Sequence, residues 1–412
     1  MSNDQTEVIP QAQPKTKVAL FALTLAFFQV GLTAFGFSIV QKIKSLVIQK
    51  GWLNQEEVDE GMALVQLYPG PMMVDFTAFT GYKLRGVIGA LLATLAFILP
   101  SFVLIIILSV AYFASGSFPW VHPLFGGLEA LIVGIILNVT FDFGSRSLKG
   151  KVEALIALAA FTALLFKANA VLIVLGALAI GALFLRPQKK NDEPQSLMTV
   201  QSSTKTPWRT WLPILAVVAV ILAGVGYSVW LNSDIGRMGL SFFKIGSVAF
   251  GNGSTILPLI QNEVLDTHHW LTPSQFADGI ALGQITPGPV LIMSAFVGYK
   301  IGGFGAAALM TFAMFSPSFA MTLIFTEVFS KLKNLRVIKG ALNGVLASFV
   351  GLLAVVVLQL AKTGITGPAS LALAAGAFIG VHYLKLDILW VFLGGLLVWA
   401  GMLSLGIATI PY

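Results

Sequence analysis

Two short motifs place prolines around a glycine inside apolar sequence, an arrangement that could bind an anion. The first lies in "LVQLYPGPMMVDF" and the second in "LGQITPGPVLIMS", 218 residues further along the chain. Proline disfavours helical backbone in the residue before it and has no N–H donor, so each motif should end a helix. Glycine permits the turn, and the second proline suits the first position of a new helix. The motif residues are Pro69, Gly70 and Pro71 in the first copy and Pro287, Gly288 and Pro289 in the second.

A helix that begins inside a membrane is suited to binding negative charge. Its first N–H groups have no partner within the helix, and the helix dipole is positive at that end. Irregular backbone is tolerated at membrane depth only where it is buried in protein or lines a wet cavity. A single motif of this kind could also be a simple kink, but two matching copies favour an anion-binding site built from both.

Polar residues near the motifs complete the predicted site. Gln66 and Gln284, three residues before each motif, could donate hydrogen bonds to an anion. Asp75 should repel the anion unless it is protonated or paired with a lysine or arginine, so a proton carrier and a simple ion pair both stay open. We also place in the predicted binding site three residues of the matching segments "AFGFS" and "AFGNG", namely Gly36, Gly251 and Asn252.

Four basic residues lie in or near the same segments. They could supply field or gating charge for an anion, or they could reach the membrane interface as lysines at helix ends do. Both interpretations stay open. These residues are Lys83, Arg85, Lys244 and Lys300.

Composition indicates the elements that must position these residues. Hydrophobic residues make up 57% of the 412 residues and charged residues only 10%, against about 25% in soluble domains. Residues 86–113 and 302–326 contain no charge, which is enough to cross a bilayer as helix. The fold class is therefore an all-α polytopic membrane protein, since barrel strands would show alternation. The lipid bilayer is an expected partner.

Several classes of function are not expected. The chain has no cysteine and its four histidines form no cluster, so we predict no metal and no cofactor. The net charge of +7 comes from short loops between apolar runs, so no nucleic-acid partner is expected. No nucleophile, paired acids or metal ligands gather in the apolar segments, so the protein is not expected to be an enzyme.

A hydrophilic stretch divides the chain into two similar halves. Motifs of the first half recur in the second at offsets of 215 to 218 residues, which indicates a duplicated unit. We predict an N-terminal cytoplasmic tail (1–17), a first transmembrane repeat (18–185), a cytoplasmic linker (186–209), an extra helix (210–232) and a second repeat (233–412).

Loop charge predicts that the second repeat is inverted. The loop after the third apolar span has no lysine or arginine, whereas its counterpart carries four, and the next loop shows the opposite bias. We expect about thirteen transmembrane helices, with the Pro-Gly-Pro segments broken but crossing the membrane. The N-terminus should be cytoplasmic and the C-terminus periplasmic. Inverted repeats are typical of secondary transporters with a site at the repeat interface.

The sequence resembles the chromate ion transporter family in its long form with two fused halves. The resemblance rests on "FFKIGSVAFGNGSTILPLIQNEV", "HHWLTPSQFADGIALGQITPGPVLIMSAFVGYKIGGFGAA" and "SPSFA", and on "LYPGPMMVDFTAFTGYKLRG" and "LPSF" in the first half. It implies an inner-membrane protein that exports chromate, driven by the proton gradient or membrane potential. A sulfate transporter working as importer or exchanger, and an anion channel, stay as alternatives. A homodimer is left open.

Overall fold

The computed structural model describes residues 18–35, 38–114, 121–185, 208–231, 233–251, 253–332 and 336–407, most of them in helices. The predicted tail (1–17) and nearly all of the predicted linker lie outside the described residues. The α-helices of the first half are α1 (Leu20–Thr33), α2 (Ser38–Gln49), α3 (Gln55–Leu64), α4 (Met72–Ala114), α5 (Val121–Ser147), α6 (Lys151–Leu165) and α7 (Ala170–Phe184). Those that follow are α8 (Trp208–Leu231), α9 (Asp234–Ser247), α10 (Leu257–Gln261), α11 (Pro273–Ile285), α12 (Met293–Leu332), α13 (Arg336–Gly364), α14 (Pro368–His382) and α15 (Ile388–Ser404).

The helix before each Pro-Gly-Pro motif begins with the same cap. Asn54 Oδ1 accepts a hydrogen bond from the Glu57 backbone N–H, and the Glu57 carboxylate accepts one from the Asn54 N–H. Thr272 and Gln275 form the same reciprocal pair at the start of α11. These capping boxes satisfy backbone donors that would otherwise have no partner. The predicted starts of α3 and α11 are therefore confirmed.

The chain reverses at each motif instead of continuing across the membrane. A side chain on Gly61 of α3 would collide with Phe79 of α4, and Lys83 Nζ lies 3.2 Å from Glu60 Oε2. In the second half, Gly279 of α11 lies equally close to Phe296 of α12. The expectation of crossing segments is therefore wrong, because the turn folds the new helix back along the old one.

A second reversal divides both α4 and α12 into two arms. Arg85 and Gly86 have φ/ψ values of −144°/22° and 64°/−154°, and Gly302 and Gly303 have −145°/22° and 65°/−153°. Only glycine adopts this second conformation without strain. Residues 72–84 and 293–301 thus form short inner arms, each joined by the same sharp turn to a long apolar arm.

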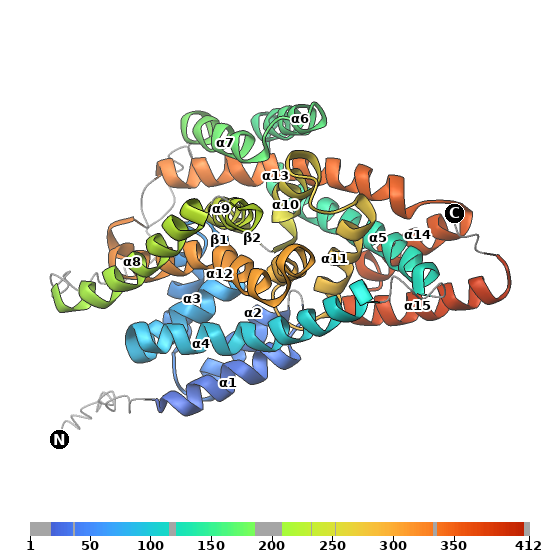
Figure 1. Cartoon of the computed structure of the whole chain (residues 1–412). Helices are drawn as coiled ribbons and strands as arrows, with labels where there is room; N and C mark the ends of the chain where they lie inside the picture. The colour runs from blue at the N-terminus through green and yellow to red at the C-terminus, as the bar shows by residue number, and fades with distance from the viewer. Residues whose placement is uncertain are drawn as a thin grey trace, which may run out of the picture.

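The two halves exchange their C-terminal helix pairs. Helices α6 and α7 lie along α13, whereas α14 and α15 lie along α5 (Figure 1). The closest approaches match: Gly134 of α5 packs on the Ala374 carbonyl, and Gly351 of α13 packs on the Ala157 carbonyl. Both partners lie 217 residues apart in the sequence, so the contacts are equivalent.

The exterior and the helix lengths suit a bilayer. Five helices are long and apolar enough to cross a membrane, and four shorter apolar helices accompany them. Large apolar side chains such as Phe166, Phe21 and Leu397 are more than three-quarters exposed, as expected for surfaces that face lipid. The predicted extra helix corresponds to α8, which packs on α9 and α12. The chain is a multi-pass α-helical membrane protein.

Candidate site at the two Pro-Gly-Pro turns

The first turn pairs with a segment of the second half. Gly70 and Pro71 form strand β1 (Gly70–Pro71), which lies parallel to β2 (Phe250–Gly251) with Gly70 opposite Phe250. The inner arm of α4 begins immediately afterwards, at Met72. The predicted site residue Gly251 therefore lies directly beside the first motif.

The second turn pairs with a segment of the first half. The Gly288 N–H donates to the Ala34 carbonyl at 2.8 Å, and Ser101 Oγ of α4 donates to the Pro287 carbonyl at 2.5 Å. Gly288 has φ of +104°, a conformation that side chains disfavour. A 3₁₀ turn, η4 (Val290–Ile292), and then α12 follow. Each motif is thus held by the broken segment of the other half.

The two turns lie on either side of one short segment. Gly253, two residues after β2, is close to Val290 at the start of η4, since a Cβ on the glycine would lie 3.4 Å from the valine Cβ. The Pro71–Gly251 pairing joins the same segment to the first turn. The structure therefore brings the two inner helix starts into one interior region, as the sequence predicted. All six motif residues except the half-buried Pro69 are buried.

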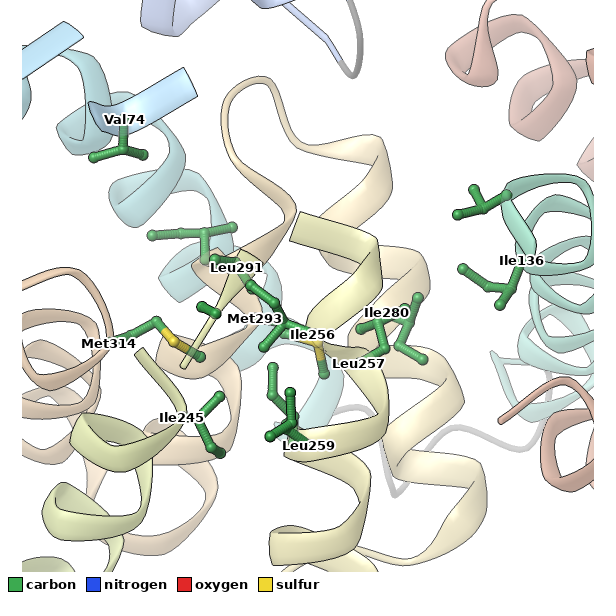
Figure 2. Packing of buried hydrophobic residues seen from close by; sticks show 14 of the residues in the cluster. Val74, Ile136, Ile245, Ile256, Leu257, Leu259, Ile280, Leu291, Met293 and Met314 are labelled. Atoms are coloured by element: carbon green, nitrogen blue, oxygen red, sulfur yellow. The ribbon is translucent and has the colours of Figure 1, made fainter. Parts of the chain in front are cut away.

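The second inner arm starts in apolar packing. Leu291 and Met293 lie beside Ile256, with Ile280 of α11 nearby (Figure 2). All four side chains are fully buried. This packing fixes the arm's position, so its first N–H groups are held by a rigid apolar frame.

The two predicted glutamines differ in position. Gln284 is 6% exposed, near the end of α11, whereas Gln66 is exposed. The structure thus places one glutamine inside the protein and the other at its surface, so their expected equivalence is wrong. The first turn leaves α3 early, at Leu64, and Gln66 lies in the irregular stretch that follows. Gly36 and Asn252 lie outside the described residues.

The four predicted basic residues lie away from the turns. Lys83 pairs with Glu60, and Arg85 donates to the Val18 carbonyl at 2.7 Å. Lys300 lies over the Phe113 ring, and Lys244 is exposed in the last turn of α9. At about 1.5 Å per residue the inner arm separates Lys83 from the first turn by nearly 20 Å.

Asp75 has no basic partner among the described residues. Its side chain is 0% exposed, and neither carboxylate oxygen has a hydrogen-bond partner in the described part of the chain. A Cβ on Gly70 would lie 1.8 Å from Asp75 Oδ2, so the carboxyl group lies directly against the first turn. Of the two interpretations left open, simple pairing is not observed.

Several buried polar residues were not predicted. Tyr68 OH is 2.7 Å from Thr322 Oγ1, and Tyr112 OH donates to Asp278 Oδ2 at 2.6 Å. Glu129 of α5 accepts a hydrogen bond from Ser274. The repeated "PSF" segments contained a signal for Ser101 and Ser318, because polar residues recurring inside apolar helices need partners.

A basic cavity lies at the outer end of the second hairpin. Its volume is about 400 Å³, and its lining includes Lys167 from the first half with Lys362 and His269 from the second. The cavity also borders Phe276 of α11. Positive groups from both halves thus meet near the helix that leads to the second turn.

A multi-pass helical protein with two re-entrant hairpins that meet at broken helices has the architecture of a membrane transporter. The family model described as "Chromate transporter" matches residues 21–182 and 236–400, so the chain belongs to the chromate transporter family. Its members transport anions, and this chain is accordingly an anion transporter.

Individual relatives match over most of their length. An uncharacterised transporter of Methanocaldococcus jannaschii is 30% identical over 82% of this chain and 83% of its own. The chromate transport protein of Cupriavidus metallidurans is 29% identical over 83% of both chains. That of Pseudomonas aeruginosa is 27% identical over 96% of this chain and 94% of its own. No solved structure matches the chain.

Proposed function

We propose that the chain is a secondary transporter that exports chromate across the cell inner membrane. The observation that carries the proposal is the reciprocal binding of the two turns, by the β1–β2 pairing and by the Gly288 to Ala34 hydrogen bond. It brings two helix N-termini together, and such termini favour anions. The names of the relatives in Cupriavidus metallidurans and Pseudomonas aeruginosa support chromate as the substrate.

In this proposal the anion binds to backbone N–H groups at the starts of the two inner arms. The motif residues shape the turns, Gly251 and Asn252 border the first turn, Gly36 borders the second, and Gln284 supplies a side-chain donor. The four basic residues act at the outer ends of the arms, where they affect the approach of the anion rather than its binding. The outward direction is a prediction from the family.

The two halves would act as inverted repeats that rock against each other. The equivalent contacts of Gly134 with Ala374 and of Gly351 with Ala157 support a twofold relation, because a twofold axis makes each contact between halves occur twice. Alternating access by such repeats opens a fixed central site to one side at a time. Energy could come from the membrane potential or the proton gradient.

The decisive experiment removes both prolines that end the outer helices. We expect Pro69→Ala combined with Pro287→Ala to abolish flux of labelled chromate in inverted vesicles, because alanine lets α3 and α11 continue and displaces the inner helix starts. Flux is compared with and without a proton gradient. Pro213→Ala, in the peripheral helix α8, is the matched control and should transport normally. Undiminished flux in a double variant that is correctly inserted would exclude the mechanism.

The same assay separates the alternatives. Sulfate is also a tetrahedral dianion, so it is added as a competitor, and stronger uptake of sulfate than chromate would reassign the substrate. Flux that never saturates and ignores the proton gradient would indicate a channel. Assembly as a homodimer stays a prediction that cross-linking in the membrane can test.

The orientation of the chain also stays a prediction. Replacing two crossing segments by two hairpins keeps the number of spans odd, so the termini still lie on opposite sides. Relative to the N-terminus, however, the first hairpin moves the basic loop around Lys149 to the other side, so loop charge no longer supports a cytoplasmic N-terminus. The chain has no native cysteine, so thiol labelling of Ser2→Cys and Thr409→Cys reports each side directly.

A further inference from the structure

Asp75 is a buried acid whose surroundings offer it neither a donor nor a cation. It lies on the inner arm of α4, against Gly70 of the first turn and close to Ser318 of α12. Both of its oxygens lack a hydrogen-bond partner in the described part of the chain. At the equivalent position the second turn has Met293, which is equally buried. One of the two helix starts thus has a titratable group that the other lacks.

The hydroxyl groups nearby are already committed. Ser318 Oγ donates to the Phe315 carbonyl at 3.2 Å, and Thr322 Oγ1 donates to the Ser318 carbonyl at 2.9 Å. Because the Thr322 proton is used in this way, Tyr68 is the donor in the 2.7 Å contact between their hydroxyls. No hydroxyl proton is left for the Asp75 carboxylate.

The charged groups on the same elements have other partners. Tyr68 is the titratable side chain that faces Asp75 from the first turn, and it carries no positive charge. On α4, Lys83 pairs with Glu60 and Arg85 binds a backbone carbonyl. On α12, Glu327 accepts a hydrogen bond from Tyr82. Among the described residues, nothing compensates a negative charge on Asp75, and an uncompensated buried carboxylate is strongly disfavoured.

We propose that Asp75 carries one proton with each anion transported. This inference rests on the proposed function and adds its coupling ion. An ionised Asp75 would repel an anion at the first turn, whereas a protonated one would not, so anion affinity and proton affinity raise each other. The proton binds to a carboxylate oxygen of Asp75 on the side where the anion enters, and leaves from it on the other side. No bond within the anion changes.

The charge balance gives a distinctive energy dependence. A dianion that moves with one proton carries a net charge of −1. An interior-negative membrane potential drives this charge outward, whereas an alkaline interior opposes the outward movement of the proton. Collapsing the potential should therefore stop export, and collapsing the pH gradient alone should increase it.

The experiment uses the purified full chain in liposomes, with labelled chromate flux and an internal pH dye recorded together. Wild-type KM should rise about tenfold for each pH unit above the titration of Asp75, and each anion should move one proton. Asp75→Asn should keep flux, lose proton movement and lose this pH dependence. Glu129→Gln, at a buried carboxyl group away from the turns, should behave like the wild type. The substrate's own protonation affects all variants equally.

The outcomes separate this inference from the proposed function. If the wild type moves neither chromate nor sulfate, the proposed function fails. If the wild type moves anion without protons, or if Asp75→Asn keeps wild-type proton movement and pH dependence, the coupling role of Asp75 is wrong. Should Asp75→Asn be unstable, the number of protons per anion in the wild type and the pH profile of Asp75→Glu decide, since the longer acid must still carry a proton.

Discussion

The two Pro-Gly-Pro turns share a sequence but differ in their surroundings. The first forms a two-residue parallel strand pair, has ordinary backbone at Gly70, and adjoins the acid Asp75. The second uses positive φ at Gly288, is held by Ser101, and is followed by buried apolar residues up to Met293. One turn thus contains a group that can titrate, and the other contains only structure.

This difference indicates a division of labour after duplication. Both turns keep the features that start a helix inside the protein, which is what the anion needs. Only one of them keeps an ionisable group, as expected if a single proton accompanies the anion. A second acid at Met293 would add another negative charge to the same region and weaken anion binding.

The largest expected effect comes from adding one methyl group to either glycine. In Gly288→Ala the new Cβ would lie 1.9 Å from Ser101 Oγ, and its positive φ costs a further 1–2 kcal/mol or about that. In Gly70→Ala it would lie 1.8 Å from Asp75 Oδ2 and 2.7 Å from Ser318 Cβ. We expect both variants to lose anion flux by about tenfold or more, measured in vesicles at equal protein content.

A second substitution distinguishes the two glycines. Ser101→Ala removes the atom that collides in Gly288→Ala but leaves the backbone strain, so the double variant should stay impaired. Full recovery would show that only the collision matters and that the two turns are sterically alike. Gly226→Ala, in α8 with open space around the added atom, is the control and should transport normally.

A smaller effect is expected from the paired serines of the "PSF" segments. Ser101→Ala leaves the buried Pro287 carbonyl without its donor, which costs about 1–3 kcal/mol. Ser318→Ala loses a bond within its own helix, where the Phe315 carbonyl keeps other partners, and should cost about 0.5–1.5 kcal/mol. Thermal unfolding in detergent, followed by tryptophan fluorescence, measures both. A larger loss at Ser318 would mean that the first turn, not the second, depends on its serine.

Much of the fold follows from local rules that the sequence displays. Asn54 and Thr272 cap helices because their side chains accept from the third backbone N–H, and Pro69 and Pro287 end those helices because they lack a donor. These effects act within a few residues, so they can be predicted without knowing the rest of the chain. The convergence of both motifs followed from their repetition.

The direction of the chain after each turn could not be predicted in this way. A broken helix and a hairpin have the same local sequence, and contacts such as Gly61 with Phe79 decide between them. The exposure of Gln66 depends in the same way on where α3 ends. The polar partners of Tyr68 and Asp75 lie on α12, almost 250 residues away, so only the folded chain brings them together.

The smallest expected effect is at the outer ends of the inner arms, where the "GYK" segments give each half a lysine. Lys83 makes a half-exposed ion pair with Glu60, and Lys300 lies 5.1 Å from the centre of the Phe113 ring. Contacts of these kinds contribute roughly 0–1 kcal/mol at exposed sites, so Lys83→Gln and Lys300→Gln should each change chromate flux less than about threefold. Raising the salt concentration should shrink the Lys83 effect further, because salt screens exposed pairs. A loss of flux beyond tenfold in either variant, with normal stability, would instead show that the lysine gates the anion, and a loss in only one would extend the difference between the turns to the ends of their arms.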